Sequence, residues 1–140
     1  MIGAIAGDII GSVYEWSRIK TKKFDLFDPD CFFTDDTVLT VALAESILTG
    51  NNYASLMKDR CRRYPHAGYV GWFHQWAQAQ DNQPYNSWGN GAAMRISSVG
   101  FAFDTLDEVL VRAEEYTEPS LAIILRERPI LARKIAAAVA

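Results

Sequence analysis

The sequence predicts an all-α fold, and three features of its patterning support this class. Apolar residues recur at helical spacing, no segment alternates with a period of two for long, and glycine or proline separates several of the segments. A chain of 140 residues that is 49% hydrophobic and 22% charged can bury a modest core. We therefore expect one compact helical domain with no substantial sheet.

The composition argues against several classes of partner. A net charge of −3 and a pI near 5.3 create no field that would attract nucleic acid or an anionic membrane. The first apolar stretch is interrupted by Asp8, and no apolar run is long enough to span a bilayer. Cys31 and Cys61 lie far apart, and no signal peptide is evident. We expect a soluble, cytoplasmic protein.

The first element is a helix from Ile2 to about Tyr14. Gly3, Gly7 and Gly11 recur every four residues on one of its faces. Three glycines cost the helix roughly 1 kcal/mol each relative to alanine. We therefore expect this face to point inward, at a close contact with another helix or a ligand.

The remaining elements follow from periodicity and from the residues that start and stop helices. Residues 17–33 lose the apolar period and are predicted to form a loop. The next helix starts at Thr34-Asp35-Asp36-Thr37 and stops at Gly50. Further helices are predicted over residues 53–64, 69–80, 92–99 and 105–116, with a polar loop at 81–91.

The segment Thr34-Asp35-Asp36-Thr37 is the strongest candidate for chemistry, and two interpretations are open. Thr or Asp oxygens accept hydrogen bonds from free amides at a helix start, so the pair of aspartates could simply cap the helix. Carboxylates flanked by hydroxyls are also the hard oxygen ligands that Mg²⁺ prefers, and adjacent carboxylates can serve two neighbouring ions. One acid would have been enough for a cap.

Two further segments carry weaker signals. Glu15 ends the first helix, where the macrodipole slightly disfavours a carboxylate, so it is either a solvated surface residue or a functional one. The loop from Ser87 to Gly91 is either a plain turn or a ligand-binding loop, in which Trp88 offers an aromatic surface and backbone amides reach phosphate oxygens.

The order of these segments resembles the order of motifs in the ADP-ribosylglycohydrolase family. The resemblance rests on Gly3-x-x-x-Gly7-Asp8-x-x-Gly11-x-x-x-Glu15, then Thr34-Asp35-Asp36-Thr37, then Gly89-Asn90-Gly91-Ala92-Ala93-Met94-Arg95. It covers residues 1–116, which we expect to form the N-terminal part of such a domain. It implies a helical domain that uses a pair of Mg²⁺ or Mn²⁺ ions to hydrolyse the bond between ADP-ribose and its acceptor.

The resemblance also implies roles for individual residues. Thr34, Asp35 and Asp36 correspond to metal ligands of the family's first half, with the two aspartates counted among the catalytic groups, and Glu15 to a catalytic or gating carboxylate at the mouth of the site. The residues that would line the diphosphate and ribose are Ser87, Trp88, Gly89, Asn90 and Gly91. The implied substrate is an ADP-ribosylated protein or a small ADP-ribose conjugate.

The chain departs from the family pattern after Thr117. Complete members are about twice as long or more, and their second half supplies an Asp-x-Asp-Thr segment that this chain lacks. Residues 117–140 form a divergent apolar tail, which we expect to be helical and to mediate self-association. One hypothesis for its origin is a frameshift between about Thr117 and Leu121, which the codons of the gene would test.

Two other function classes stay open at this point. The chain could be a non-catalytic helical module that binds a nucleotide-like ligand without turning it over. It could also be a structural helical protein in which Asp35 and Asp36 only cap a helix.

Overall fold

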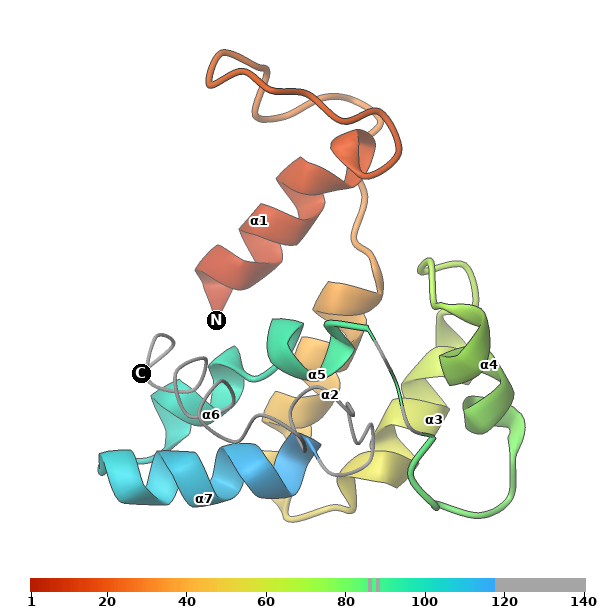
Figure 1. Ribbon diagram of the computed structural model, residues 1–140, viewed down its shortest axis with the longest axis vertical. Helices are drawn as coiled ribbons and strands as arrows, with labels where there is room; N and C mark the ends of the chain where they lie inside the picture. Colours follow the sequence, from red (N-terminus) through yellow and green to blue (C-terminus); the bar gives the residue numbers. More distant parts are fainter. Residues whose placement is uncertain (86, 88, 118–140) are drawn as a thin grey trace.

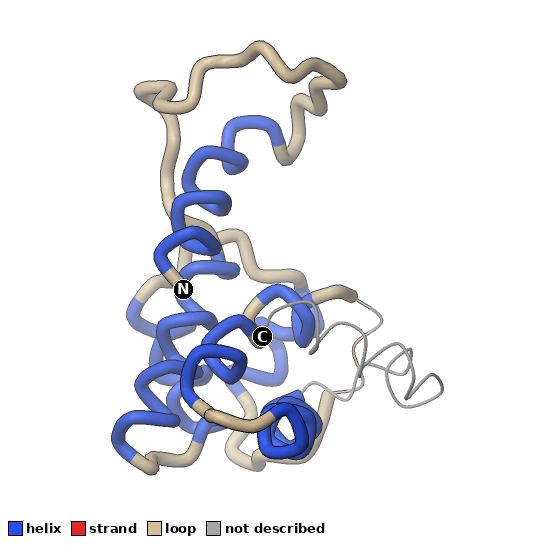
Figure 2. Tube along the Cα trace, turned by 90° about the vertical axis from the view of Figure 1, so that its left-hand side faces the viewer, coloured by secondary structure: helices blue, strands red, loops and turns tan. Residues whose placement is uncertain are grey.

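Helix α2 (Asp35–Thr49) lies at the centre of the fold, with α1, α3, α5 and α6 packed against it (Figure 1). The structure is a computed structural model that describes residues 1–85, 87 and 89–117. In chain order the other elements are α1 (Ile2–Gly11), the 3₁₀ turn η1 (Ser12–Tyr14), α3 (Tyr53–Arg63), α4 (Gly71–Gln78), α5 (Gly91–Met94), α6 (Ser97–Ala102) and α7 (Leu106–Thr117). None of the described residues lies in a β-strand, as the tube in Figure 2 also shows, so the predicted all-α fold is confirmed.

Both ends of α2 follow from the local sequence. Thr34, in an extended conformation, is the N-cap, and its hydroxyl accepts a hydrogen bond from the Asp36 amide. Gly50 follows the last turn with φ of 72°, a left-handed conformation that glycine adopts without strain. The predicted start and stop of this helix are therefore confirmed.

The hydrophobic core lies among α2, α3, α4, α6 and α7 and contains no residue of α1. Its buried members are Leu39, Ala42, Leu43, Tyr53, Ala54, Met57, Cys61, Phe73, Trp76, Ala77, Ile96, Val99, Val109 and Ala113. An apolar face on each contributing helix is covered by its neighbours, which is how amphipathic helices gain most of their stability in a folded chain. The core therefore holds α2 through its buried face.

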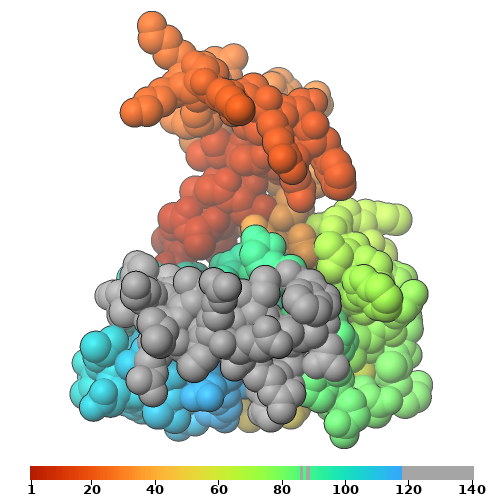
Figure 3. Space-filling model, viewed as in Figure 1, coloured from red at the N-terminus to blue at the C-terminus, as the bar shows by residue number. Residues whose placement is uncertain are grey.

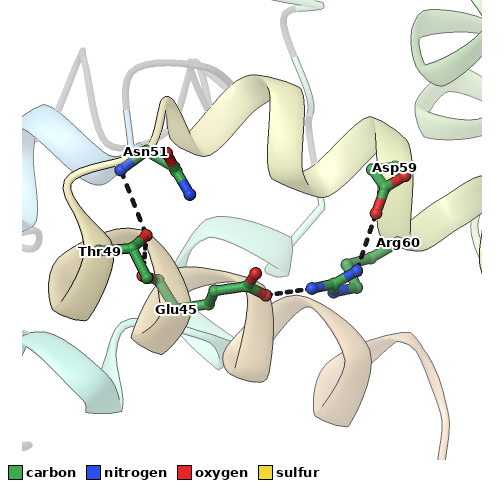
Figure 4. Close-up of polar contacts among 5 residues, drawn as sticks. All are labelled: Glu45, Thr49, Asn51, Asp59 and Arg60. Atoms are coloured by element: carbon green, nitrogen blue, oxygen red, sulfur yellow. Dashed lines mark hydrogen bonds and ion pairs between the residues drawn. The ribbon is translucent and has the colours of Figure 1, made fainter.

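Polar contacts join α2 to α3 along their exposed edge (Figure 4). Arg60 of α3 forms an ion pair with Glu45 of α2 and a second one with Asp59 at 2.8 Å. At the turn between the helices, the Thr49 hydroxyl donates to the Glu45 carbonyl at 2.7 Å and accepts from the Asn51 amide at 3.3 Å. These contacts fix the direction in which α3 leaves α2.

Helix α1 and the segment that follows it stand away from the helical body. Figures 1 and 2 show α1 crossing above the other helices, and the orange segment in Figure 3 projects beyond it. No residue of α1 is fully buried, and Ile5, Ile9 and Ile10 are half-buried. Trp16, at 90% exposure, belongs to the projecting segment.

The predicted inward orientation of the glycine face of α1 is wrong. Gly3, Gly7 and Gly11 are exposed, and apart from the adjacent residues and backbone of α1 itself no described atom lies within 4 Å of a Cβ built on any of them. Helical spacing identifies which residues share a face, but the neighbouring elements decide which face is covered. In this fold α1 turns a different side, the one that carries Asp8, toward α2.

A second correction concerns residues 92–99, which were predicted to form one short helix. The chain instead forms α5 and α6, separated by a turn at Arg95 and Ile96. The turn buries both of these neighbouring side chains, at 1% and 3% exposure. Helix α4 also begins two residues later than predicted, because Val70 is extended.

Two sequence-based expectations fall on residues that the structure does not describe. These are the helical, self-associating tail beyond Thr117 and the ligand contact of Trp88. Among the described residues, no helix has the length and apolar character that crossing a membrane requires.

Candidate active site

The carboxylate of Asp8 holds the residues on both sides of the aspartate pair. Its Oδ2 accepts hydrogen bonds from the amides of Thr34 and Thr37 at 2.8 and 3.2 Å. The Thr37 hydroxyl donates to the same oxygen at 2.5 Å, and the Thr34 hydroxyl donates to Oδ1 at 2.5 Å. One side chain of α1 thus brackets Asp35 and Asp36 at the start of α2.

The first turn of α2 is capped without the carboxylates of Asp35 and Asp36. The Asp35 amide donates to the Ala67 carbonyl at 2.6 Å, and the Asp36 amide donates to the Thr34 hydroxyl at 3.3 Å. The Thr37 amide donates to Asp8. Because each of these amides has a partner elsewhere, the two carboxylates are not needed as caps. This arrangement weakens the interpretation in which the pair only caps the helix.

The two carboxylates lie in an acidic and partly desolvated environment. Burial, followed by the charges of Asp36 and Glu15, raises the pKa of Asp35 to about 7. Burial, followed by Asp8 and then Glu15, also raises the pKa of Asp36. Ionisation of both groups therefore costs free energy that a nearby cation would offset.

Glu15 is exposed and follows the 3₁₀ turn that extends α1. The charge of Glu15 contributes to the raised pKa of both Asp35 and Asp36. Glu15 therefore lies within electrostatic reach of the pair, although it stands twenty positions before Asp35 in the sequence. That the three carboxylates share one concavity stays a prediction. Helix α1, held to α2 by Asp8, is the element that brings Glu15 to the site.

A buried cation, Arg95, lies within electrostatic reach of Asp36. Arg95 is 1% exposed, and its positive charge lowers the pKa of Asp36 against the larger effect of burial. Its guanidinium carbon lies 5.7 Å from the centre of the Tyr53 ring. A Cβ placed on Gly91 would lie 3.6 Å from Arg95 Nη1, so the end of the predicted ligand loop passes over this arginine.

The loop from Ser87 to Gly91 reaches α2 through α5, which it opens. The Ser87 hydroxyl accepts a hydrogen bond from the Gly89 amide at 3.0 Å, as in a plain turn, and Asn90 is the N-cap residue of α5. Gly91 lies next to Arg95, whose charge acts on Asp36. The hydrogen bond between Ser87 and Gly89 lies within the loop and does not reach Asp35, and the binding role of Ser87, Gly89 and Asn90 stays a prediction.

The donor atoms of this region fit part of a divalent-metal site. Within the described part of the chain, no three His, Cys, Asp or Glu side chains are grouped as a complete metal site. Asp35 and Asp36 nonetheless offer carboxylate oxygens that no cap uses, and Thr34 offers a hydroxyl whose proton is directed to Asp8. Hard oxygen donors of this kind suit Mg²⁺ or Mn²⁺.

Asp8 and Arg95 were not predicted to have a role, yet Asp8 binds both residues that flank the aspartate pair and Arg95 acts on the pKa of Asp36. The sequence context of each residue could have indicated that it is functional. Asp8 is an acid within an otherwise apolar helix, and Arg95 is a lone charge between apolar residues. Charged residues in such positions are rarely buried unless they are paired.

The fold and the site define a helical domain whose central helix begins with two aspartates that do not act as its cap. The charges of Glu15 and of the buried Arg95 act on this pair. The family model for ADP-ribosylglycohydrolase matches residues 1–121, and the chain belongs to this family. The matched region includes every candidate site residue and ends four residues after Thr117.

Two curated relatives are similar to the chain. ADP-ribosylhydrolase ARH3 of Xenopus tropicalis is 27% identical over 143 aligned positions, covering 79% of this chain and 40% of the relative. ADP-ribosylhydrolase ARH3 of Mus musculus is 27% identical over 146 positions, covering 78% of this chain and 39% of the relative. The chain spans about two fifths of the length of these relatives.

Proposed function

We propose that this chain provides the first set of ligands of a divalent-metal centre that hydrolyses the bond between ADP-ribose and its acceptor. The observation that carries the proposal is the state of Asp35 and Asp36. Their carboxylates lie together with raised pKa values, while other groups cap the helix that they begin. Thr34 and Asp8 already accept the hydrogen bonds of the Asp36 and Thr37 amides, so capping does not account for the partial burial of the two carboxylates.

In this proposal Thr34, Asp35 and Asp36 hold Mg²⁺ or Mn²⁺, and Ser87, Trp88, Gly89, Asn90 and Gly91 bind the diphosphate and ribose. The bound ion would supply positive charge that orients the ribose, stabilises developing negative charge and activates water. Glu15, exposed at the edge of the acidic region, would accept or return a proton as the anomeric substituent leaves. The substrate would be an ADP-ribosylated protein or a small conjugate.

Because the described residues supply ligands from one side of the centre only, we expect weak metal binding and little hydrolysis from the 140-residue chain by itself. A calorimetric titration with Mg²⁺ and ADP-ribose, followed by a turnover assay on an ADP-ribosylated protein, tests the proposal. Metal-dependent binding of ADP-ribose, with slow turnover that Glu15→Gln abolishes, would support it.

The same experiment separates the two other function classes. Binding of ADP-ribose without any turnover would favour a non-catalytic nucleotide-binding module. Absence of both metal and ADP-ribose binding would favour a structural protein. Robust Mg²⁺-dependent turnover by a monodisperse monomer would contradict the expectation that this chain is impaired.

A further inference from the structure

We propose that Asp8 is a positioning residue that holds Asp35 and Asp36 in place for metal binding, an inference that rests on the proposed function. Asp8 lies in α1 and touches neither aspartate through a hydrogen bond. It contacts instead the residue immediately before the pair and the residue immediately after it, Thr34 and Thr37. Any role in the site is therefore exerted through the backbone of the turn between them.

The geometry of the four hydrogen bonds restricts this turn at both ends. Thr34 and Thr37 each donate an amide and a hydroxyl proton to the single carboxylate of Asp8, at 2.5 to 3.2 Å. Hydrogen bonds to an ionised acceptor are shorter and stronger than neutral ones. Since the carboxylate holds both flanking residues, the intervening pair cannot rotate about the helix axis without breaking several of these bonds.

Asp8 also accepts hydrogen bonds at the turn that carries the proposed metal ligands. By accepting from the Thr37 amide, it satisfies a first-turn amide that the N-cap, Thr34, leaves free. By accepting the Thr34 hydroxyl proton, it leaves oxygen lone pairs of Thr34 available for the Asp36 amide and a cation. A simple helix–helix contact would not require this division of roles.

The same carboxylate fixes the direction of α1 relative to α2. Helix α1 contributes no residue to the buried hydrophobic core, and the four hydrogen bonds to Asp8 join it directly to the start of α2. The Ser12 hydroxyl, which accepts from the Phe32 amide at 3.1 Å, ties α1 only to its own following loop. Asp8 therefore couples the placement of Glu15 to that of Asp35 and Asp36.

A set of four variants of the 140-residue chain tests this role by Mn²⁺ titration. Asp8→Asn changes the acceptor, Thr37→Val removes one hydroxyl donor, and Thr37→Ser keeps that hydroxyl. Ser98→Ala is the control, because Ser98 donates to the Thr40 carbonyl at 3.2 Å in the buried part of α2, away from the pair. We expect Mn²⁺ affinity to fall at least tenfold in Asp8→Asn and about fivefold in Thr37→Val. Thr37→Ser and Ser98→Ala should stay within twofold of the parent chain.

Amide hydrogen exchange provides a second measurement that needs no metal. The expected result is faster exchange of the Asp36 and Thr37 amides in Asp8→Asn and Thr37→Val, with α3 and α7 unchanged. Equal acceleration throughout the chain, or none, would overturn the positioning role. So would full Mn²⁺ affinity in Asp8→Asn, which leaves the proposed function standing. If the parent chain bound no Mn²⁺, the proposed metal site would fail, and the positioning role with it, even if exchange showed the contact to be local.

Discussion

The positive charge of Arg95, which is buried from solvent, lowers the pKa of the partly buried Asp36. The sign of this coupling is opposite to that of Asp8 and Glu15, which raise the pKa of the same carboxyl. Asp36 is therefore influenced by charges of both signs, the carboxylates of Asp8 and Glu15 and the buried guanidinium of Arg95. This arrangement favours a site in which Asp36 stays ionised more readily than Asp35.

Replacing Arg95 with methionine should raise the pKa of Asp36 further and destabilise the fold. We expect a loss of roughly 1–3 kcal/mol in the free energy of unfolding, the range typical of losing a buried interaction. Carboxyl resonances followed by NMR over a pH series, together with urea unfolding, measure the two effects. Arg112→Met is the matched control, because Arg112 also lies over an aromatic ring, Phe103 at 5.5 Å, but is much more exposed. An unchanged Asp36 titration in Arg95→Met would contradict the coupling.

Without metal, the stability of the chain should carry a pH-dependent contribution from Asp35. Its folded pKa of about 7 is above its unfolded value of 3.8, so the folded state binds more protons between these values. Stability from this group is therefore present at low pH, falls as pH rises from about 4 to about 7, and changes little above that. Unfolding curves of the parent chain and Asp35→Asn across pH 5–8 measure it, and Asp35→Asn should show a shallower fall.

Mn²⁺ should stabilise the parent chain more at pH 8 than at pH 6, because the ligands must be deprotonated.

The glycine face of α1 leads to a prediction about stability. No described atom would contact a Cβ at Gly7, and its backbone is helical, so Gly7→Ala should stabilise the chain by about 0.5–1 kcal/mol. Gly50→Ala is the control, since its φ of 72° should make the same change destabilising by roughly 1–2 kcal/mol. Thermal unfolding distinguishes the two. Destabilisation by Gly7→Ala would mean that the glycine face does pack closely against another group.

The sequence was sufficient to predict the helices that have strong local signals. Helix α2 has a capping threonine and a terminal glycine, and its bounds were predicted correctly from these residues. The break at Arg95 was not predicted, because it depends on burial of an arginine among other helices rather than on a local helix-breaking residue. The covered face of α1 was wrong for a similar reason, since periodicity does not identify the neighbour.

The candidate site shows the same division. The residue types at Thr34, Asp35 and Asp36 were enough to suggest both a cap and a metal site. Only the tertiary structure separates these interpretations, because Asp8 reaches the same turn from 26 residues earlier in the chain. Partners so distant in sequence cannot be inferred from local spacing alone.

The central claim is that the carboxylates at the start of α2 serve a ligand rather than the helix. Calorimetric Mg²⁺ titration of Asp36→Asn, with urea unfolding of the same variant, tests it most directly, and Thr34→Val provides the comparison for a lost cap, which should cost about 1 kcal/mol. We expect Asp36→Asn to weaken Mg²⁺ binding at least tenfold and to change the unfolding free energy by less than about 0.5 kcal/mol. Unaltered Mg²⁺ binding with a loss of stability like that of Thr34→Val would show that Asp36 is a structural cap.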